Sequence, residues 1–151
     1  MQALSLKQPW AELLFPEQPS AGGLFPQPGR PIKTIETRWW GRALQTQARR
    51  LAGHRIAIHA SKSLDCDGLN NLHRTYAIDI DTRSLARGAI IGTVLLIGCC
   101  NLTPEHETSA LCECAGKFGL LLAHPRRLAE PIPTRGMLGF FTIPNIPEEL
   151  S

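Results

Sequence analysis

The chain has 151 residues, of which 43% are hydrophobic and 19% are charged, with 13 glycines and 12 prolines. This length suits one domain, 1–151, with a core of its own, and the many turn-forming residues favour a β-rich fold over a helical bundle. The longest apolar run, 89–100, is interrupted by Gly92 and Gly98 and is too short to cross a bilayer. We therefore expect a cytoplasmic protein with no membrane partner.

Hydrophobic periodicity predicts the elements in chain order. We expect strands at 3–6, 32–40, 54–60, 90–99, 118–124 and 139–143, and helices at 9–15, 43–51 and 63–77, with a loop or short helix from Thr103. The strand at 90–99 is apolar on both faces, which predicts a central position. Residues 16–31 hold five prolines and three glycines and predict a long irregular loop.

Charge is unevenly distributed along the chain. Between residues 30 and 62 there is one acid, Glu36, and there are eight basic residues: Arg30, Lys33, Arg38, Arg42, Arg49, Arg50, Arg55 and Lys62. Such clustering suits an anionic partner, although a solvated basic surface would give the same pattern. The five cysteines are an odd number, and their spacing does not match a zinc motif, so we expect free thiols and no metal or other cofactor.

Charged and aromatic residues are concentrated at 33–40, which reads Lys-Thr-Ile-Glu-Thr-Arg-Trp-Trp. On a strand, Glu36 and Arg38 share a face, because side chains two residues apart point the same way. Lys33 joins them only from a turn before the strand or from a bulge. A solvated strand with a surface ion pair would also explain the pattern, and would contribute little.

Five segments together resemble the ASCH family, in this order: Leu-Ser-Leu-Lys-Gln-Pro-Trp-Ala at 4–11, Lys-Thr-Ile-Glu-Thr-Arg at 33–38, Arg-Ile-Ala-Ile-His-Ala at 55–60, Gly-Ala-Ile-Ile-Gly-Thr-Val at 88–94, and Pro-Arg-Arg-Leu-Ala-Glu-Pro-Ile-Pro at 125–133. The resemblance covers about 3–143. It implies an α+β fold, namely a PUA-like mixed and mostly antiparallel β-barrel with two or three peripheral helices. It also implies an RNA-binding cleft.

The resemblance places Lys7 and Gln8 at the cleft, in a strand-to-helix turn that suits an anion or a carbonyl group. Arg38 would orient Glu36 or grip a phosphate. One of Trp39 and Trp40 would stack on a base, while the other would belong to the core. His59 and Lys62 would bind a ligand, although a structural role for the histidine explains the pattern equally well. Arg126 would lie on the rim, although a solvated pair with Arg127 is the simpler interpretation.

Three functions are compatible with these residues. The first is binding of RNA or a modified nucleoside in a basic cleft. The second is a small amidohydrolase acting on N4-acylated cytidine, or less readily a ribonuclease, with Lys33 and Glu36 as catalytic residues. A bacterial amidohydrolase of the family carries a threonine where this chain has Glu36, so the hydroxyl nucleophile is missing there. The third is a protein-interaction module that uses the loop at 16–31.

Overall fold

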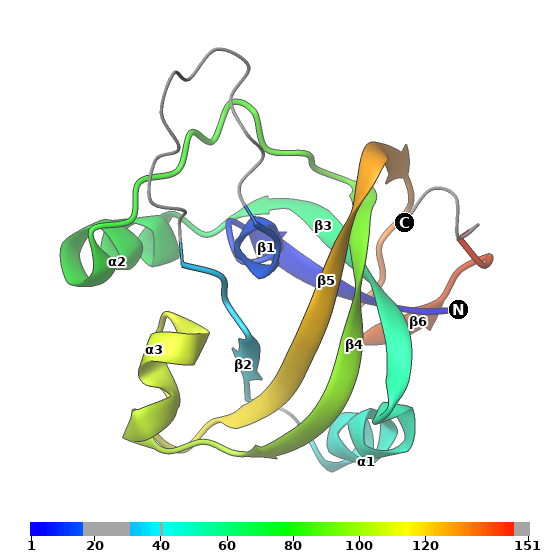
Figure 1. The fold of residues 1–151 in the computed structure, drawn as a ribbon, viewed down its shortest axis with the longest axis horizontal. Coiled ribbons are helices and arrows are strands. Elements are labelled where there is room, and N and C mark those ends of the chain that lie inside the picture. Colours follow the sequence, from blue (N-terminus) through cyan, green and yellow to red (C-terminus); the bar gives the residue numbers. More distant parts are fainter. Residues whose placement is uncertain (17–30, 40, 147–151) are drawn as a thin grey trace.

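The computed structural model describes residues 1–16, 31–39 and 41–146. Most of the loop expected at 16–31 therefore lies outside the described residues, as does Trp40. The described part is an α+β fold with one six-stranded sheet and helices at its periphery (Figure 1).

The sheet is mixed and mostly antiparallel, as expected. Its strands are β1 (Gln2–Gln8), β2 (Ile35–Arg38), β3 (His54–Leu64), β4 (Ala89–Asn101), β5 (Phe118–Pro133) and β6 (Phe140–Thr142). They follow the order β2-β5-β4-β3-β1-β6, in which β1 and β3 are parallel and the other neighbours are antiparallel. Strand β4 lies in the interior of the sheet between β3 and β5, which confirms its predicted central position. The backbone pairings of the described residues leave β2 and β6 at the two edges.

Three α-helices are described: α1 (Arg42–Leu51), α2 (Cys66–Tyr76) and α3 (Glu107–Ala110). Two 3-10 turns, η1 (Glu12–Leu14) and η2 (Pro104–His106), complete the elements. Helix α2 begins where the Asp65 side chain accepts a hydrogen bond from the Gly68 N–H at 2.9 Å, and it ends at Ala77 in the left-handed region. No helix among the described residues is long and apolar enough to cross a membrane.

The main core lies inside the curled sheet. Strand residues such as Leu4, Ile58 and Leu120 are fully buried there, and Phe15 joins them from the end of η1. A Cβ at position 92 would lie 2.6 Å from the Arg126 carbonyl oxygen, so Gly92 allows β4 and β5 to approach closely. The resulting core holds β1, β3, β4 and β5 as one unit.

Several elements differ in length from those predicted. The helix expected at 9–15 is only the single turn η1. Residues 9–11 form a turn, and η1 then places Leu13 and Leu14 in buried positions. Strand β2 is shorter than expected and begins at Ile35. Strands β3 and β5 continue beyond their predicted ends, and β5 does so through His124, which has a positive φ of 47°.

Two irregularities in strand pairing shape one side of the sheet. In the parallel β1–β3 pair the register jumps between Leu6 and Gln8, so that Lys7 lies opposite the residues 61–63. In the β3–β4 pair the register shifts between Ile58 and His59. Bulges re-aim side chains and are common beside functional sites. Both shifts fall next to the cleft described below.

Candidate functional site

A cleft lies between β1, β2, β3 and the segment that precedes β6. It consists of two cavities, of about 440 and 710 Å³, which share four lining residues: Ser5, Ser61, Met137 and Leu138. The smaller cavity is further lined by Leu6, Lys7, Trp10, Glu36, Thr37, Arg38 and Ser63. The larger cavity is further lined by His59, Lys62, Gly88, Pro133, Thr134, Arg135 and Gly136. Because the walls are shared, we treat the two cavities as one cleft with two ends.

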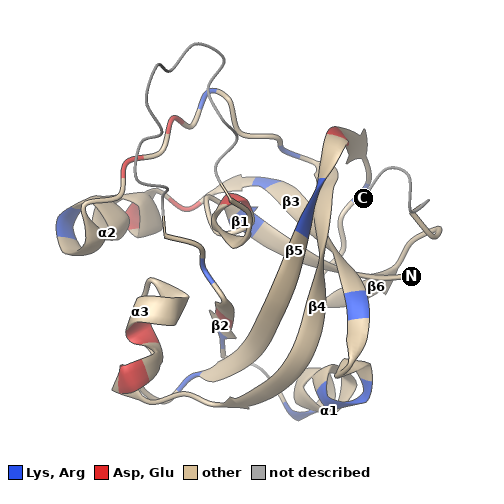
Figure 2. Cartoon of the chain, viewed as in Figure 1, with Lys and Arg blue, Asp and Glu red and all other residues tan. Residues whose placement is uncertain are grey.

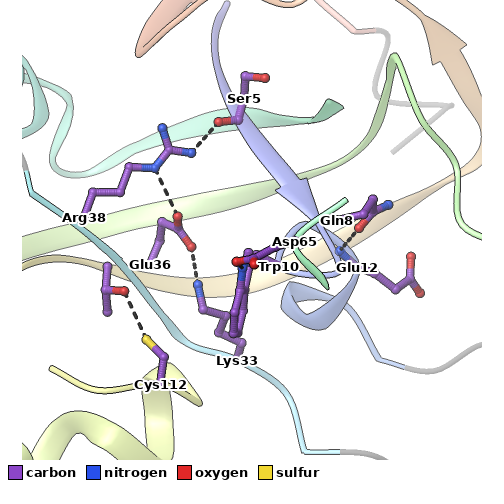
Figure 3. A network of polar contacts seen from close by, with 10 residues as sticks. Ser5, Gln8, Trp10, Glu12, Lys33, Glu36, Arg38, Asp65 and Cys112 are labelled. Carbon is purple, nitrogen blue, oxygen red and sulfur yellow. Dashed lines mark hydrogen bonds and ion pairs between the residues drawn. The ribbon is translucent and has the colours of Figure 1, made fainter. Parts of the chain in front are cut away.

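A row of charged groups forms the wall of the smaller end (Figure 3). The Lys33 ammonium donates to Glu36 Oε2, and Arg38 Nε donates to Glu36 Oε1 at 3.3 Å. Arg38 Nη2 then donates to the backbone carbonyl of Ser5 at 2.6 Å. Glu36 is 4% exposed and Lys33 is 2% exposed, so this is a buried ion pair with a partly exposed arginine at its outer end.

Lys33 precedes β2, and this position lets it reach the same side as Glu36. Its backbone N–H donates to the Leu13 carbonyl at 2.7 Å, outside any strand ladder. The Lys33 side chain is not among the described side chains that line the cleft. It reaches the cleft only through Glu36 and through Trp10, whose ring centroid lies 5.3 Å from Lys33 Nζ. Lys7, Glu36 and Arg38 line the smaller cavity directly, whereas Lys33 is buried behind Glu36.

Trp10 supplies an aromatic wall. Its indole Nε1–H donates to Asp65 Oδ2 at 2.7 Å, and Asp65 also caps helix α2. A Cβ at Gly68 would lie 2.6 Å from the indole, so the first turn of α2 lies directly against the ring. With the Lys33 cation near the ring as well, the indole is held in a fixed orientation.

The Gln8 side chain is hydrogen-bonded to neighbouring backbone groups and does not line the cleft. Its Nε2 donates to the Ala86 carbonyl at 2.8 Å, and its Oε1 accepts from the Glu12 N–H at 3.1 Å. The residue is fully buried. Gln8 therefore ties the turn after β1 to the segment before β4, while its neighbour Lys7 is exposed and lines the cleft.

His59 and Ser5 occupy the boundary between the two ends. Ser5 Oγ lies 2.9 Å from His59 Nδ1, and His59 Nε2 lies 2.9 Å from the carbonyl oxygen of Thr134. Burial lowers the pKa of His59, and the hydrogen bond to the Thr134 carbonyl opposes that shift. His59 was expected at the end of its strand, but β3 continues to Leu64.

The cleft is rich in cations. Its described lining carries Lys7, Arg38, Lys62 and Arg135, against the single carboxylate of Glu36. Figure 2 shows acidic residues at α3 and at the turn that precedes it, where Glu107 and Glu105 lie, and neither residue lines the cleft. The cleft is thus electrostatically suited to an anionic ligand.

Other predicted site residues lie elsewhere. Trp39 is 76% exposed and follows β2, but its ring lies near Gly116. Trp40 is outside the described residues. Arg126 is exposed on β5 opposite Thr93, where it lowers the pKa of the neighbouring Arg55 by charge repulsion, after the larger effect of burial. The basic run at 30–62 is therefore dispersed, with Arg42, Arg49 and Arg50 on helix α1.

No family model and no curated protein matches the chain. All five cysteines are free thiols, and the described residues hold no group of three or more His, Cys, Asp or Glu side chains that could bind a metal ion. Burial, followed by nearby charges, raises the pKa of Cys114 to about 11.

Sequence reasoning missed several residues of the cleft. Trp10 packs against a core cluster and also lines the cleft, and the sequence pattern did not indicate a place in the cleft for Ser5, Arg135, Met137 or Leu138. A signal for the last two is present in the sequence, because Met137 and Leu138 are apolar residues between two glycines. They are 62% and 98% exposed. Because they also line both cavities, these two exposed apolar side chains offer an apolar surface at the cleft.

Proposed function

We propose that this chain is an ASCH-type, PUA-like domain that binds RNA or a modified nucleoside in the cleft. The observation that carries the proposal is the composition of the cleft wall. It combines four cations with a fixed indole, a single buried carboxylate and two exposed apolar side chains. Cations suit phosphate groups, and an aromatic or apolar surface suits the face of a base.

The finer fold assignment, a PUA-like barrel, belongs to the same proposal. Its support is the contact between Arg38 on edge strand β2 and Ser5 on β1, which lie far apart in the strand order. The sheet curls enough for these two strands to meet through a side chain. In this proposal, the contact between the Arg38 side chain and Ser5 stands where backbone hydrogen bonds would otherwise close the barrel. The cleft then lies between strands β2 and β1.

The ion-pair row suggests how a ligand is oriented. Arg38 is the exposed end of the row and has a partly accessible guanidinium group, so it is the natural partner for a phosphate or a base carbonyl. Glu36 is already held by Lys33 and Arg38, so it acts mainly to fix the guanidinium plane. Lys62, at the larger end, supplies a second phosphate contact.

Catalysis by Lys33 and Glu36 has less support. Both side chains are committed to a buried ion pair. The two threonines nearest in sequence do not replace the missing nucleophile, because Thr34 precedes the strand and the Thr37 hydroxyl lies 3.1 Å from Cys112 Sγ. We therefore rank binding above amide hydrolysis by this pair.

The test is a fluorescence anisotropy titration of labelled single-stranded RNA at several salt concentrations, with a parallel panel of acylated and unmodified nucleosides monitored by mass spectrometry. We expect affinity to fall with salt, with a log–log slope of about −0.7 for each phosphate contacted. Lys62→Ala should reduce both affinity and slope, whereas Arg74→Ala, at an exposed residue of α2, should change neither. Binding that is unaffected by Lys62→Ala, or no binding to any member of the panel, would refute the proposal.

A further inference from the structure

The boundary between the two ends of the cleft holds three groups in a row. Ser5 and His59 are direct register partners in the parallel β1–β3 pair, which brings Ser5 Oγ to 2.9 Å from His59 Nδ1. On the other side of the ring, His59 Nε2 is 2.9 Å from the Thr134 carbonyl oxygen. A hydroxyl, an imidazole and an acceptor that orients the imidazole are the parts of an activated nucleophile.

The chemistry of the acceptor fixes where the protons lie. A carbonyl oxygen can only accept, so His59 Nε2 carries the proton and donates it to Thr134. Burial lowers the pKa of His59 from its ordinary value of 6.5, so the ring is neutral near pH 7 and Nδ1 has a free lone pair. The Ser5 hydroxyl therefore donates to Nδ1, which is the arrangement in which a base can withdraw the serine proton.

The row is both held in place and open to a ligand. Phe141 contacts the imidazole edge-on, with ring centroids 5.8 Å apart. The backbone at Gly136 lies against the ring so closely that a Cβ there would come within 2.6 Å of Nδ1. Ser5 nevertheless lines both cavities of the cleft, and Figure 3 shows its hydroxyl pointing away from the carbonyl that Arg38 binds.

We propose that Ser5 is the nucleophile of an acyl-transfer reaction, with His59 as its general base, acting on an ester or an activated amide that carries an anionic group. The anionic group is inferred from Lys62 and Arg135, which line the same cavity as the Ser5–His59 pair. This activity goes beyond the proposed binding function. It also differs from hydrolysis by Lys33 and Glu36, because it places the hydroxyl nucleophile on β1.

The reaction is balanced with water as the only co-reactant. The Ser5 oxygen forms a bond to the acyl carbon while its proton moves to His59 Nδ1. The tetrahedral oxyanion, stabilised by the cations of the cavity, then collapses, and the bond to the leaving group breaks as the imidazolium returns the proton to that group. Water attacks the acyl-serine in the same way, giving one proton to Nδ1, and releases a carboxylic acid and the free Ser5 hydroxyl.

The test is covalent labelling of the folded protein with a fluorophosphonate, followed by intact mass measurement and peptide mapping. We expect one adduct on the wild-type protein, mapped to Ser5, and no such adduct on Ser5→Ala. His59→Gln should label about a hundredfold more slowly. Ser84→Ala is the matched control, because this exposed serine donates to the backbone carbonyl of Asp81, and it should label at the wild-type rate.

The labelling rate should rise with pH through a pKa below 6.5 and then level off, as His59 loses its proton. The charged side chains that line the cavity with His59 are Lys62 and Arg135. A wild-type protein that stays unlabelled, or an adduct that maps to another residue, overturns the proposal even if Ser5→Ala does not fold. Labelling and RNA affinity are measured on the same sample, so failure of this activity is distinguishable from failure of the binding function.

Discussion

Arg38 Nη2 donates a hydrogen bond of 2.6 Å to the backbone carbonyl of Ser5. The two residues lie on β2 and β1, the first and fifth strands in the order β2-β5-β4-β3-β1-β6. This contact therefore crosses the open side of a curled sheet. It sets the distance between the wall that carries Glu36 and the wall that carries Ser5 and His59, and so it sets the width of the cleft.

Arg38→Ala should weaken RNA binding more than Arg50→Ala does. Arg38 lines the cleft and holds both walls, whereas Arg50 is exposed on helix α1. Loss of a specific bidentate contact costs about 1–3 kcal/mol of binding free energy. The measurement is an anisotropy titration at fixed salt, with thermal unfolding as a check on the fold. Equal losses of RNA affinity in the two variants would mean that only the diffuse positive charge of the protein contributes to binding.

Glu36→Gln should destabilise the protein, by about 3–5 kcal/mol, because it leaves the Lys33 ammonium buried beside a neutral amide. Lys33→Met should cost less, since Glu36 keeps its bond to Arg38. The control is Arg83→Ala, which breaks an exposed pair with Asp81 and should have little effect. Urea unfolding measures all three variants. A Glu36→Gln protein as stable as the control would show that the pair is solvated.

Gly136→Ala should displace the His59 ring, because the added methyl group would lie 2.6 Å from Nδ1. We expect a loss of about 1–3 kcal/mol of stability, the usual cost of overfilling a packed site. The imidazole NMR signals of His59 should also shift. Gly41→Ala is the matched control, since a Cβ there meets nothing within 4 Å and φ is −66°. Unchanged His59 signals in Gly136→Ala would contradict the geometry.

His59 should make folding stability depend on pH. Its pKa is lowered in the folded protein from 6.5, mainly by burial, so well above pH 6.5 both folded and unfolded chains hold it neutral and its contribution is complete. As the pH falls below 6.5, the unfolded chain binds the proton first, and stability decreases until the lower folded pKa is reached. Urea unfolding of wild type and His59→Gln at pH 7.5 and 5.5 should show a smaller pH dependence in the variant.

Thiol reactivity should separate the cysteines by position. Cys114 is buried and its pKa is raised to about 11, so little thiolate forms at pH 8, whereas Cys66 is exposed. Iodoacetamide should modify Cys66 early and Cys114 only when the protein unfolds. Peptide mass spectrometry over a time course measures this order. Early modification of Cys114 in folded protein would contradict its burial.

The fold was largely predictable because its main elements obey simple periodicities. Strand β4 is apolar on both faces and is central, and helix α1 follows its expected bounds within one residue. What could not be predicted was the extension of β5 beyond His124. Pairing with β4 resumes at Arg126 after an irregular step, and that pairing depends on partners far away in the sequence.

The site was predicted only in part, for a similar reason. Spacing indicated that Glu36 and Arg38 share a face, since they lie on one strand. It could not indicate that Ser5 pairs with His59, because that contact depends on the register of a parallel pair 54 residues apart. The irregular register beside Lys7, which places residues 61–63 on the cleft, is likewise a tertiary property.

The two walls of the cleft differ in how firmly the sheet holds them. Ser5 and His59 lie on β1 and β3, and each of these strands has a paired neighbour on both sides. Arg38 lies at the end of the four-residue strand β2, which the described pairings join to β5 alone. If the cleft binds a ligand as proposed, we expect any adjustment to the size of that ligand to fall on the Arg38 wall. The wall that carries the proposed Ser5–His59 pair is thus anchored by paired strands on both sides, whereas the Arg38 wall is anchored on one side only.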